Sequence, residues 1–205
     1  MVQDSTDGVS VLSLTHLGYP KDHKSEATYY SALGLQKNGI LNDLMVLDIA
    51  NGGDIDQSRI SVPVPGGKTL PRALYALDSF VDEMKTRDYI TRLLDYFASR
   101  RIDGADVLHT FPSFVKTPRI NKEHGGTNVV YGATLHPEVN ERLISEEISE
   151  SNYQVAPNPP IPAQHGIDYA DYILSLSSLS KKSYVQAGFE EEQIFNVGPL
   201  GIDSA

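Results

Sequence analysis

Apolar residues in this chain gather in short continuous runs. A run of four to eight apolar residues without alternation is typical of a strand that is covered on both faces of a sheet. A further extended segment at 58–67 contains two prolines, Pro63 and Pro65, which place it at the edge of a sheet. Strands are expected at 9–14, 44–50, 58–67, 105–111, 127–137, 170–177 and 193–200.

Between these runs, apolar side chains recur at helical spacing. One stripe runs from Leu70 to Met84 in steps of four and three, and a second runs from Ile90 to Phe97, as expected for helices that face a core. Further helices are expected over 27–39, 113–126, 137–150 and 178–193. In the helix over 27–39, Ser25 is the expected N-cap and Gly39 the expected end. Pro118 is expected to interrupt the helix over 113–126, Pro137 to lie in the first turn of the helix over 137–150, and Gly188 to lie near the end of the last helix.

The alternation of strands and helices predicts an open, doubly wound, parallel α/β sheet of the Rossmann-like type. Ligands of such sheets bind at the carboxyl ends of the strands, so the loops after residues 14, 50, 111 and 135 are the candidates for chemistry. The proline-rich segment 154–166 has no periodicity and is expected to be a rigid spacer or a surface loop.

Composition removes several classes of function. The 205 residues include no Cys, which excludes a thiol nucleophile, a thiolate metal site and disulfides. The net charge of −10 disfavours nucleic acid and anionic membranes unless basic residues cluster locally. The chain has no 18-residue apolar run, and its acidic, polar start is unlike a signal peptide. A cytoplasmic protein is expected, with peripheral contact at the inner face of the membrane left open.

The candidate chemistry is carried by histidines. His16, His109 and His136 fall at or just beyond the ends of predicted strands. A neutral imidazole donates and accepts hydrogen bonds near physiological pH, which suits sugar hydroxyls and phosphate oxygens. The alternative for each is a hydrogen-bonded structural histidine. No phosphate-binding glycine loop and no His–Glu metal motif occurs, so neither a classical nucleotide loop nor a metal site is expected.

Two short polar segments have alternative interpretations. The segment "GYPKDHK" (18–24) places basic residues before a helix, which favours either an anion site or a solvated loop. Ser178 and Lys181 form an S-x-x-K pattern, and in a Ser-rich helix start this indicates a cap much more often than a nucleophile.

Three segments together resemble a known family. These are "DVLHTF" (106–111), "GATLHPEVNERLISEE" (132–147) and "ADYILSLSSLSKKSYVQAGFEEEQIFNVGPLGID" (170–203). They are similar to the N-terminal domain of the family 4 retaining glycosyltransferases, which have the two-domain GT-B fold. The resemblance divides the chain into a polar tail (1–8), an acceptor-side Rossmann-like domain (9–200) and the start of an interdomain hinge (201–205).

The resemblance implies transfer of a hexose from a nucleotide-diphosphate sugar to a glycan, lipid or small-molecule acceptor, with retention and without a cofactor or metal. Gly201-Ile202-Asp203 would mark the crossing to a C-terminal donor-binding domain, so this chain would be a truncated enzyme that is inactive alone.

The resemblance also assigns roles to individual residues. His136 would be catalytic, close to the donor sugar. Gly18 and Tyr19 would bind substrate on the cleft floor, and His109 and Thr134 would contact the acceptor or the cleft. Two alternatives remain open: a non-catalytic binding module that acts with a separate catalytic chain, and one half of a sugar-nucleotide epimerase.

Overall fold

The computed structural model describes residues 11–14, 23–46, 54–66, 69, 83–150 and 165–198. Within them, seven strands form one parallel sheet in the order β3-β2-β1-β4-β5-β6-β7. The strands are β1 (Val11–Leu14), β2 (Leu41–Met45), β3 (Ile60–Ser61), β4 (Val107–Thr110), β5 (Thr127–Gly132), β6 (Tyr172–Ser175) and β7 (Ile194–Asn196). The predicted doubly wound parallel sheet is confirmed, with 58–67 supplying the edge strand β3.

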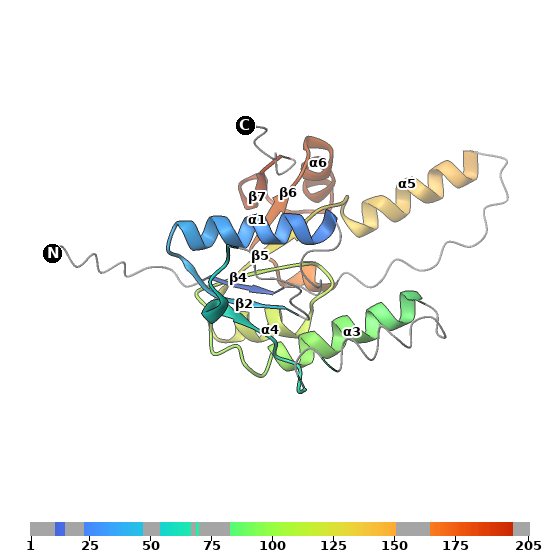
Figure 1. The fold of residues 1–205 in the computed structure, drawn as a ribbon. Helices are drawn as coiled ribbons and strands as arrows, with labels where there is room; N and C mark the ends of the chain where they lie inside the picture. The colour runs from blue at the N-terminus through green and yellow to red at the C-terminus, as the bar shows by residue number, and fades with distance from the viewer. Residues whose placement is uncertain are drawn as a thin grey trace.

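Helices lie on both sides of this sheet. The α-helices are α1 (His23–Lys37), α3 (Glu83–Ala98), α4 (Lys116–Glu123), α5 (Pro137–Glu150) and α6 (Ser178–Gln186). Short 3-10 helices are η1 (Gln57–Arg59), η3 (His165–Tyr169) and η4 (Glu191–Gln193). Figure 1 shows α1 on one side of the sheet and α3 and α4 on the other, while α5 projects away from the sheet.

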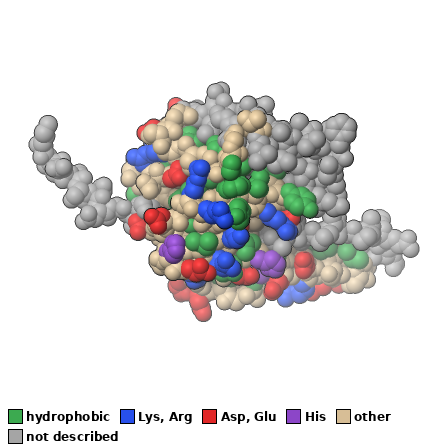
Figure 2. All heavy atoms as spheres, turned by 90° about the horizontal axis from the view of Figure 1, so that it is seen from below, with side chains coloured by type: hydrophobic (Ala, Val, Ile, Leu, Met, Phe, Trp, Pro, Cys, Tyr) green, Lys and Arg blue, Asp and Glu red, His purple; other side chains and the backbone are tan. Residues whose placement is uncertain are grey.

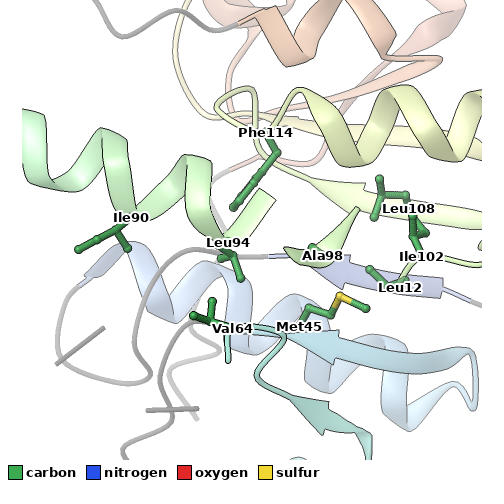
Figure 3. Packing of buried hydrophobic residues seen from close by; sticks show 9 residues of the cluster. All are labelled: Leu12, Met45, Val64, Ile90, Leu94, Ala98, Ile102, Leu108 and Phe114. Carbon is green, nitrogen blue, oxygen red and sulfur yellow. The ribbon is translucent and has the colours of Figure 1, made fainter. Parts of the chain in front are cut away.

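The core is divided by the sheet into separate clusters. Leu12 and Leu108 pack with Leu94 of α3 and with Phe114, which follows β4, on one face (Figure 3). On the other face, Leu44 of β2 packs against Ala32 of α1. A third cluster joins Val130 and Ile173 to Tyr184 of α6.

Some helix ends differ from those expected. α1 begins at His23, two residues before its expected cap Ser25, and ends at Lys37. Gly39 lies in the turn that follows, where its φ of +72° suits glycine. Pro118 does not interrupt α4, because that helix begins only at Lys116 and the proline lies in its first turn. Residues 70–82, the greater part of the first predicted apolar stripe, lie outside the described residues.

β2 also differs from its expected range, since it begins at Leu41 rather than at residue 44. The pattern missed its first part because Asp43 interrupts the apolar run. This carboxylate accepts hydrogen bonds from the hydroxyl of Ser61 on the edge strand β3, at 2.9 and 3.0 Å. Burial raises the pKa of Asp43, and the Ser61 hydroxyl opposes that shift.

The first turn of α4 is held by a carboxylate from another helix. Asp95 of α3 accepts hydrogen bonds from the backbone N–H groups of Val115, Lys116 and Thr117 at 2.7–2.9 Å. The next residue, Pro118, has no N–H to satisfy. Asp95 therefore completes the N-terminus of α4, fixing it against α3.

Candidate functional site at the carboxyl ends of the strands

The strand order reverses between β1 and β4. From β1 the chain builds outward through β2 and β3, and β4 then pairs with the other side of β1. In open parallel sheets, ligands bind in the crevice at the carboxyl ends of the two strands at such a reversal. The described strands end there at Leu14 and Thr110, beside the end of β5 at Gly132.

His109 lies inside β4, one residue before its carboxyl end. It is buried, and its Nδ1 lies 3.3 Å from the hydroxyl of Ser13 on β1. Its ring meets the ring of Tyr131 on β5 edge to face. Burial lowers the pKa of His109 to about 4, so the imidazole is neutral at pH 7. The other nitrogen, Nε2, is buried without a hydrogen-bond partner within the described part of the chain.

The loop after β5 is fastened to α6 by serine hydroxyls. Ser180 donates to the carbonyl oxygens of Gly132 and Thr134, at 3.2 and 2.8 Å. Ser183 accepts a hydrogen bond from the backbone N–H of His136 at 2.9 Å. Ser177 caps α6 by accepting from the N–H of Ser180 at 3.0 Å, which confirms that the Ser-rich segment acts as a helix cap. These contacts fix the path of the loop.

His136 lies between this loop and the first turn of α5. Its carbonyl oxygen accepts from the N–H of Asn140, and Pro137 begins α5, as predicted. The ring packs edge to face on Tyr184 at a centroid distance of 5.5 Å and also contacts Phe189. Burial lowers the pKa of His136, against the opposing effect of Glu138 and Asp168. The imidazole is therefore neutral at pH 7.

A histidine that follows a strand end and precedes Pro137 is expected to project its ring into the crevice, but the ring of His136 is packed against other side chains instead. The residue is only 8% exposed, because α6 and the residue Phe189 supply an aromatic wall that the local sequence did not reveal. Its Nδ1 is buried without a partner within the described residues. His136 thus combines a packed ring with one unused nitrogen.

The structure does not bring the two histidines together. Side chains alternate along a strand, so His109 and Tyr131 share one face of the sheet, and Val130 lies on the other. Val130 packs in the same cluster as Tyr184, the residue on which His136 lies. The two rings therefore lie on opposite sides of the sheet.

The remaining candidate residues follow β1 and β5 in the sequence. Thr134 is exposed, and its Oγ1 makes a local contact of 3.3 Å with the carbonyl of Leu135. Gly18, Tyr19 and His16 lie outside the described residues, as does most of the "GYPKDHK" segment.

Unpartnered buried polar atoms lie near the ends of β4 and β5, on both sides of the sheet. In the described ranges they include His109 Nε2, Thr110 Oγ1, Ser113 Oγ, His136 Nδ1 and the hydroxyl of Tyr184. Buried polar groups in folded proteins are nearly always hydrogen-bonded, so such a concentration favours a ligand-binding region. The sequence pattern identified the histidines but missed Tyr184, Ser180 and Ser183, because their contact with the loop spans more than forty residues of chain.

A pocket of 520 Å³ opens beside this region, between α3, the start of α4 and η3. Ser113 and Val115, from the loop after β4, line it together with Tyr96, Lys116 and His165. No sequence motif indicated this pocket.

No group of three or more His, Asp or Glu side chains in the described part of the chain could hold a metal ion. No described helix is long and apolar enough to cross a membrane.

No known protein family matches this sequence, and no curated protein matches it significantly. Solved structures with the same fold do exist. TcCGT1 in complex with UDP is 14% identical, with a TM-score of 0.56 over 97% of this chain. A Listeria monocytogenes protein assigned as a UDP-N-acetylglucosamine 2-epimerase is 14% identical, with a TM-score of 0.54 over 92%. The lipopolysaccharide outer core galactosyltransferase WaaB is 12% identical, with a TM-score of 0.50 over 96%.

This chain spans about half the length of those proteins: 52%, 44% and 47% of them in the same order. At such low identity the likeness shows the fold. The chain therefore has the Rossmann-like α/β fold of one half of the GT-B architecture.

Proposed function

We propose that this chain is the acceptor-side half of a glycosyltransferase that transfers a hexose from a nucleotide-diphosphate sugar. The observation that carries the proposal is the set of unpartnered polar atoms at the carboxyl ends of β4 and β5, beside the reversal of strand order. Similarity in fold to the galactosyltransferase WaaB and to UDP-bound TcCGT1 supports it.

His136 is the proposed catalytic residue. Its ring orientation is fixed by Tyr184, and its backbone N–H is fixed by Ser183, so the imidazole is positioned before any ligand binds. A neutral, preorganised imidazole suits a hydrogen bond to a sugar hydroxyl as charge develops at the reacting carbon. In the reaction, the bond from the sugar C1 to the diphosphate breaks and the bond from C1 to the acceptor oxygen forms. The acceptor hydroxyl loses its proton to the departing diphosphate, which leaves as the nucleoside diphosphate. In the proposed reaction no metal ion takes part, and the configuration at the anomeric carbon of the sugar is retained.

Thr134, His109, Gly18 and Tyr19 are proposed to contact the acceptor or to line the cleft. Thr134 is exposed at the strand-end rim. His109 is buried, and its part would be to offer Nε2 through the floor of the crevice.

A second half that binds the donor is part of the proposal. Its support is that solved proteins with this fold are about twice as long as this chain. The described surface also has an apolar area at the β6–β7 edge, where the rings of Tyr172 and Phe195 pack together and remain 39% and 52% exposed. The site of action is proposed to be cytoplasmic.

The test is transfer of labelled hexose from a panel of UDP-sugars by the gene product that contains this chain. NMR of the product gives the anomeric configuration of the new bond. We expect transfer with retention by the gene product and none by the 205 residues alone. Turnover by the 205 residues alone, at ordinary enzyme rates of about 1–1000 per second, would contradict the proposal that a second half of the protein binds the donor.

A second candidate function is epimerisation of a nucleotide sugar, favoured by the similarity in fold to the Listeria monocytogenes protein. The same assay separates the two candidates. Inversion at C2 of UDP-N-acetylglucosamine without transfer to any acceptor would replace the transferase proposal with the epimerase one.

A further inference from the structure

The chain carries a basic region that opposes its overall charge. Residues 92–122 include six Lys or Arg and three Asp, a net charge of +3 in a chain whose net charge is −10. Figure 2 shows Lys and Arg side chains gathered with histidines on the face that α3 and α4 form. This part of the chain therefore carries a local excess of positive charge within an acidic protein.

Three of these cations line the pocket between α3, α4 and η3. They are Arg92, Lys116 and Arg119, with His165 beside them. The pocket volume of 520 Å³ lies within the range of small-molecule sites, about 300–1000 Å³. None of these four residues belongs to the proposed transferase site.

The acidic residues of the pocket do not cancel these cations. Both oxygens of Asp95 are already hydrogen-bonded to the first turn of α4, by Lys116 N and Thr117 N among others, and the residue is buried. Asp88 pairs with Arg92 at 2.8 Å, but their side chains are 42% and 72% exposed. Exposed pairs of this kind contribute little and give way readily to a stronger ligand.

The other partners of the cations are equally exposed. Arg119 lies 3.5 Å from Glu123, and His165 lies 3.7 Å from Asp168. The Lys116 ammonium lies 4.6 Å from the centroid of the Tyr96 ring, which holds the lysine at the pocket without neutralising it. The guanidinium groups and the ammonium thus remain available to one doubly charged anion.

We propose that this pocket binds a phosphate ester through the guanidinium groups of Arg92 and Arg119 and the ammonium of Lys116. Phosphate carries up to two charges and accepts paired hydrogen bonds from guanidinium, which matches this set of donors better than a single carboxylate does. The buried, unpartnered hydroxyl of Ser113 and the ring of Tyr96 lie in the same pocket, where the organic part of the ester would bind. The pocket adjoins the proposed sugar-transfer site and shares Ser113 with it, but its cations are not part of that site.

The test is calorimetric titration of the chain with inorganic phosphate and pyrophosphate in about 50 mM salt, with amide chemical shifts recorded by NMR. We expect saturable 1:1 binding, with pyrophosphate tighter, and shifts confined to α3, α4 and η3. Lys116→Gln/Arg119→Gln should weaken binding by about tenfold or more. The matched control Arg142→Gln/Lys182→Gln removes the same charge from α5 and α6, and it should change the affinity less than twofold.

A variant that binds phosphate more tightly cannot be explained by loss of folding. Asp88→Asn frees Arg92 from its ion pair, so it should tighten phosphate binding about two- to fivefold. Co-sedimentation with vesicles containing phosphatidic acid, compared with binding of a soluble sugar phosphate, distinguishes a lipid headgroup from a soluble ester. Absence of saturable binding, or equal weakening by the pocket variant and by its control, would overturn the proposal. Because binding is measured without turnover, its failure leaves the transferase proposal untouched.

Discussion

Ser13 of β1 and His109 of β4 face each other across the reversal of strand order, with Ser13 Oγ 3.3 Å from His109 Nδ1. The two residues stand in register in neighbouring strands, so this contact joins the two halves of the sheet at the strands that border the crevice. A buried hydroxyl and a neutral imidazole satisfy each other there, and the second ring nitrogen remains unused within the described chain.

This burial makes the stability of the fold depend on pH. Burial lowers the pKa of His109 from 6.5 to about 4, so between these values the unfolded chain binds a proton that the folded chain does not. The free energy of unfolding must therefore fall as the pH falls from 6.5 to 4, by on the order of 3 kcal/mol. Burial of His136 acts in the same direction. Denaturant unfolding across this range measures the slope.

His109→Gln should reduce that slope by about half or more. The exposed His124 provides the control for the loss of a histidine, and His124→Gln should leave the free energy of unfolding at pH 7 unchanged. If the slope survives in His109→Gln, protonation of the buried imidazole is not the cause of the acid sensitivity.

Because Asp95 caps a helix from another element, its substitution should lower the free energy of unfolding, which its position in the sequence does not reveal. Asp95→Asn replaces a carboxylate, whose two oxygens accept hydrogen bonds from the first turn of α4, by a neutral amide. Only one oxygen is then left to accept these hydrogen bonds. We expect a loss of about 2 kcal/mol in the free energy of unfolding. Chemical denaturation checks it, with Asp103→Asn, at an exposed position, as the control. An equal, small effect in both variants would show that the carboxylate is dispensable.

Gly132 allows Tyr184 to approach the end of β5. A Cβ at this position would lie 2.7 Å from the Tyr184 hydroxyl and 2.9 Å from a methyl group of Ile173. Gly132→Ala should therefore destabilise the fold by about 1–3 kcal/mol. Adding Tyr184→Phe should restore part of the loss, because it removes the closest atom of the clash.

Two controls accompany the Gly132 experiment. Gly34→Ala in α1 meets no atom within 4 Å and should stabilise the fold by about 1 kcal/mol. Tyr184→Phe alone should be close to neutral, since the hydroxyl has no partner within the described residues. Failure of the double variant to recover any stability would place the strain at Ile173 or at the ring carbon of residue 184, each 2.9 Å from the added Cβ.

The sequence predicted the fold well because strand formation here depends on local apolar runs. The runs around Val107, Val130 and Ile173 all became strands, and the prolines near Ile60 correctly indicated a sheet edge. β2 was displaced because Asp43 interrupts its apolar pattern, and the polar side chain is satisfied by a partner eighteen residues away.

The candidate site could be predicted only in part. The position of His109 near a strand end follows from the strand pattern alone, whereas Thr134 became a candidate only through the family resemblance. The surroundings of His136 do not, because Tyr184 and Ser183 reach it from a helix more than forty residues later. The cap that Asp95 gives α4 and the cationic pocket beside it likewise depend on contacts between elements.

The most direct test of the central claim compares His136→Phe with the unaltered gene product in the hexose-transfer assay. Phenylalanine keeps the ring packed on Tyr184 and removes both nitrogens, so the melting temperature should change little. The account predicts that the transfer rate falls about 100–1000-fold, as when one positioned polar contact to a transition state is removed. Unchanged transfer by a folded His136→Phe variant would contradict it and leave His136 as a structural residue.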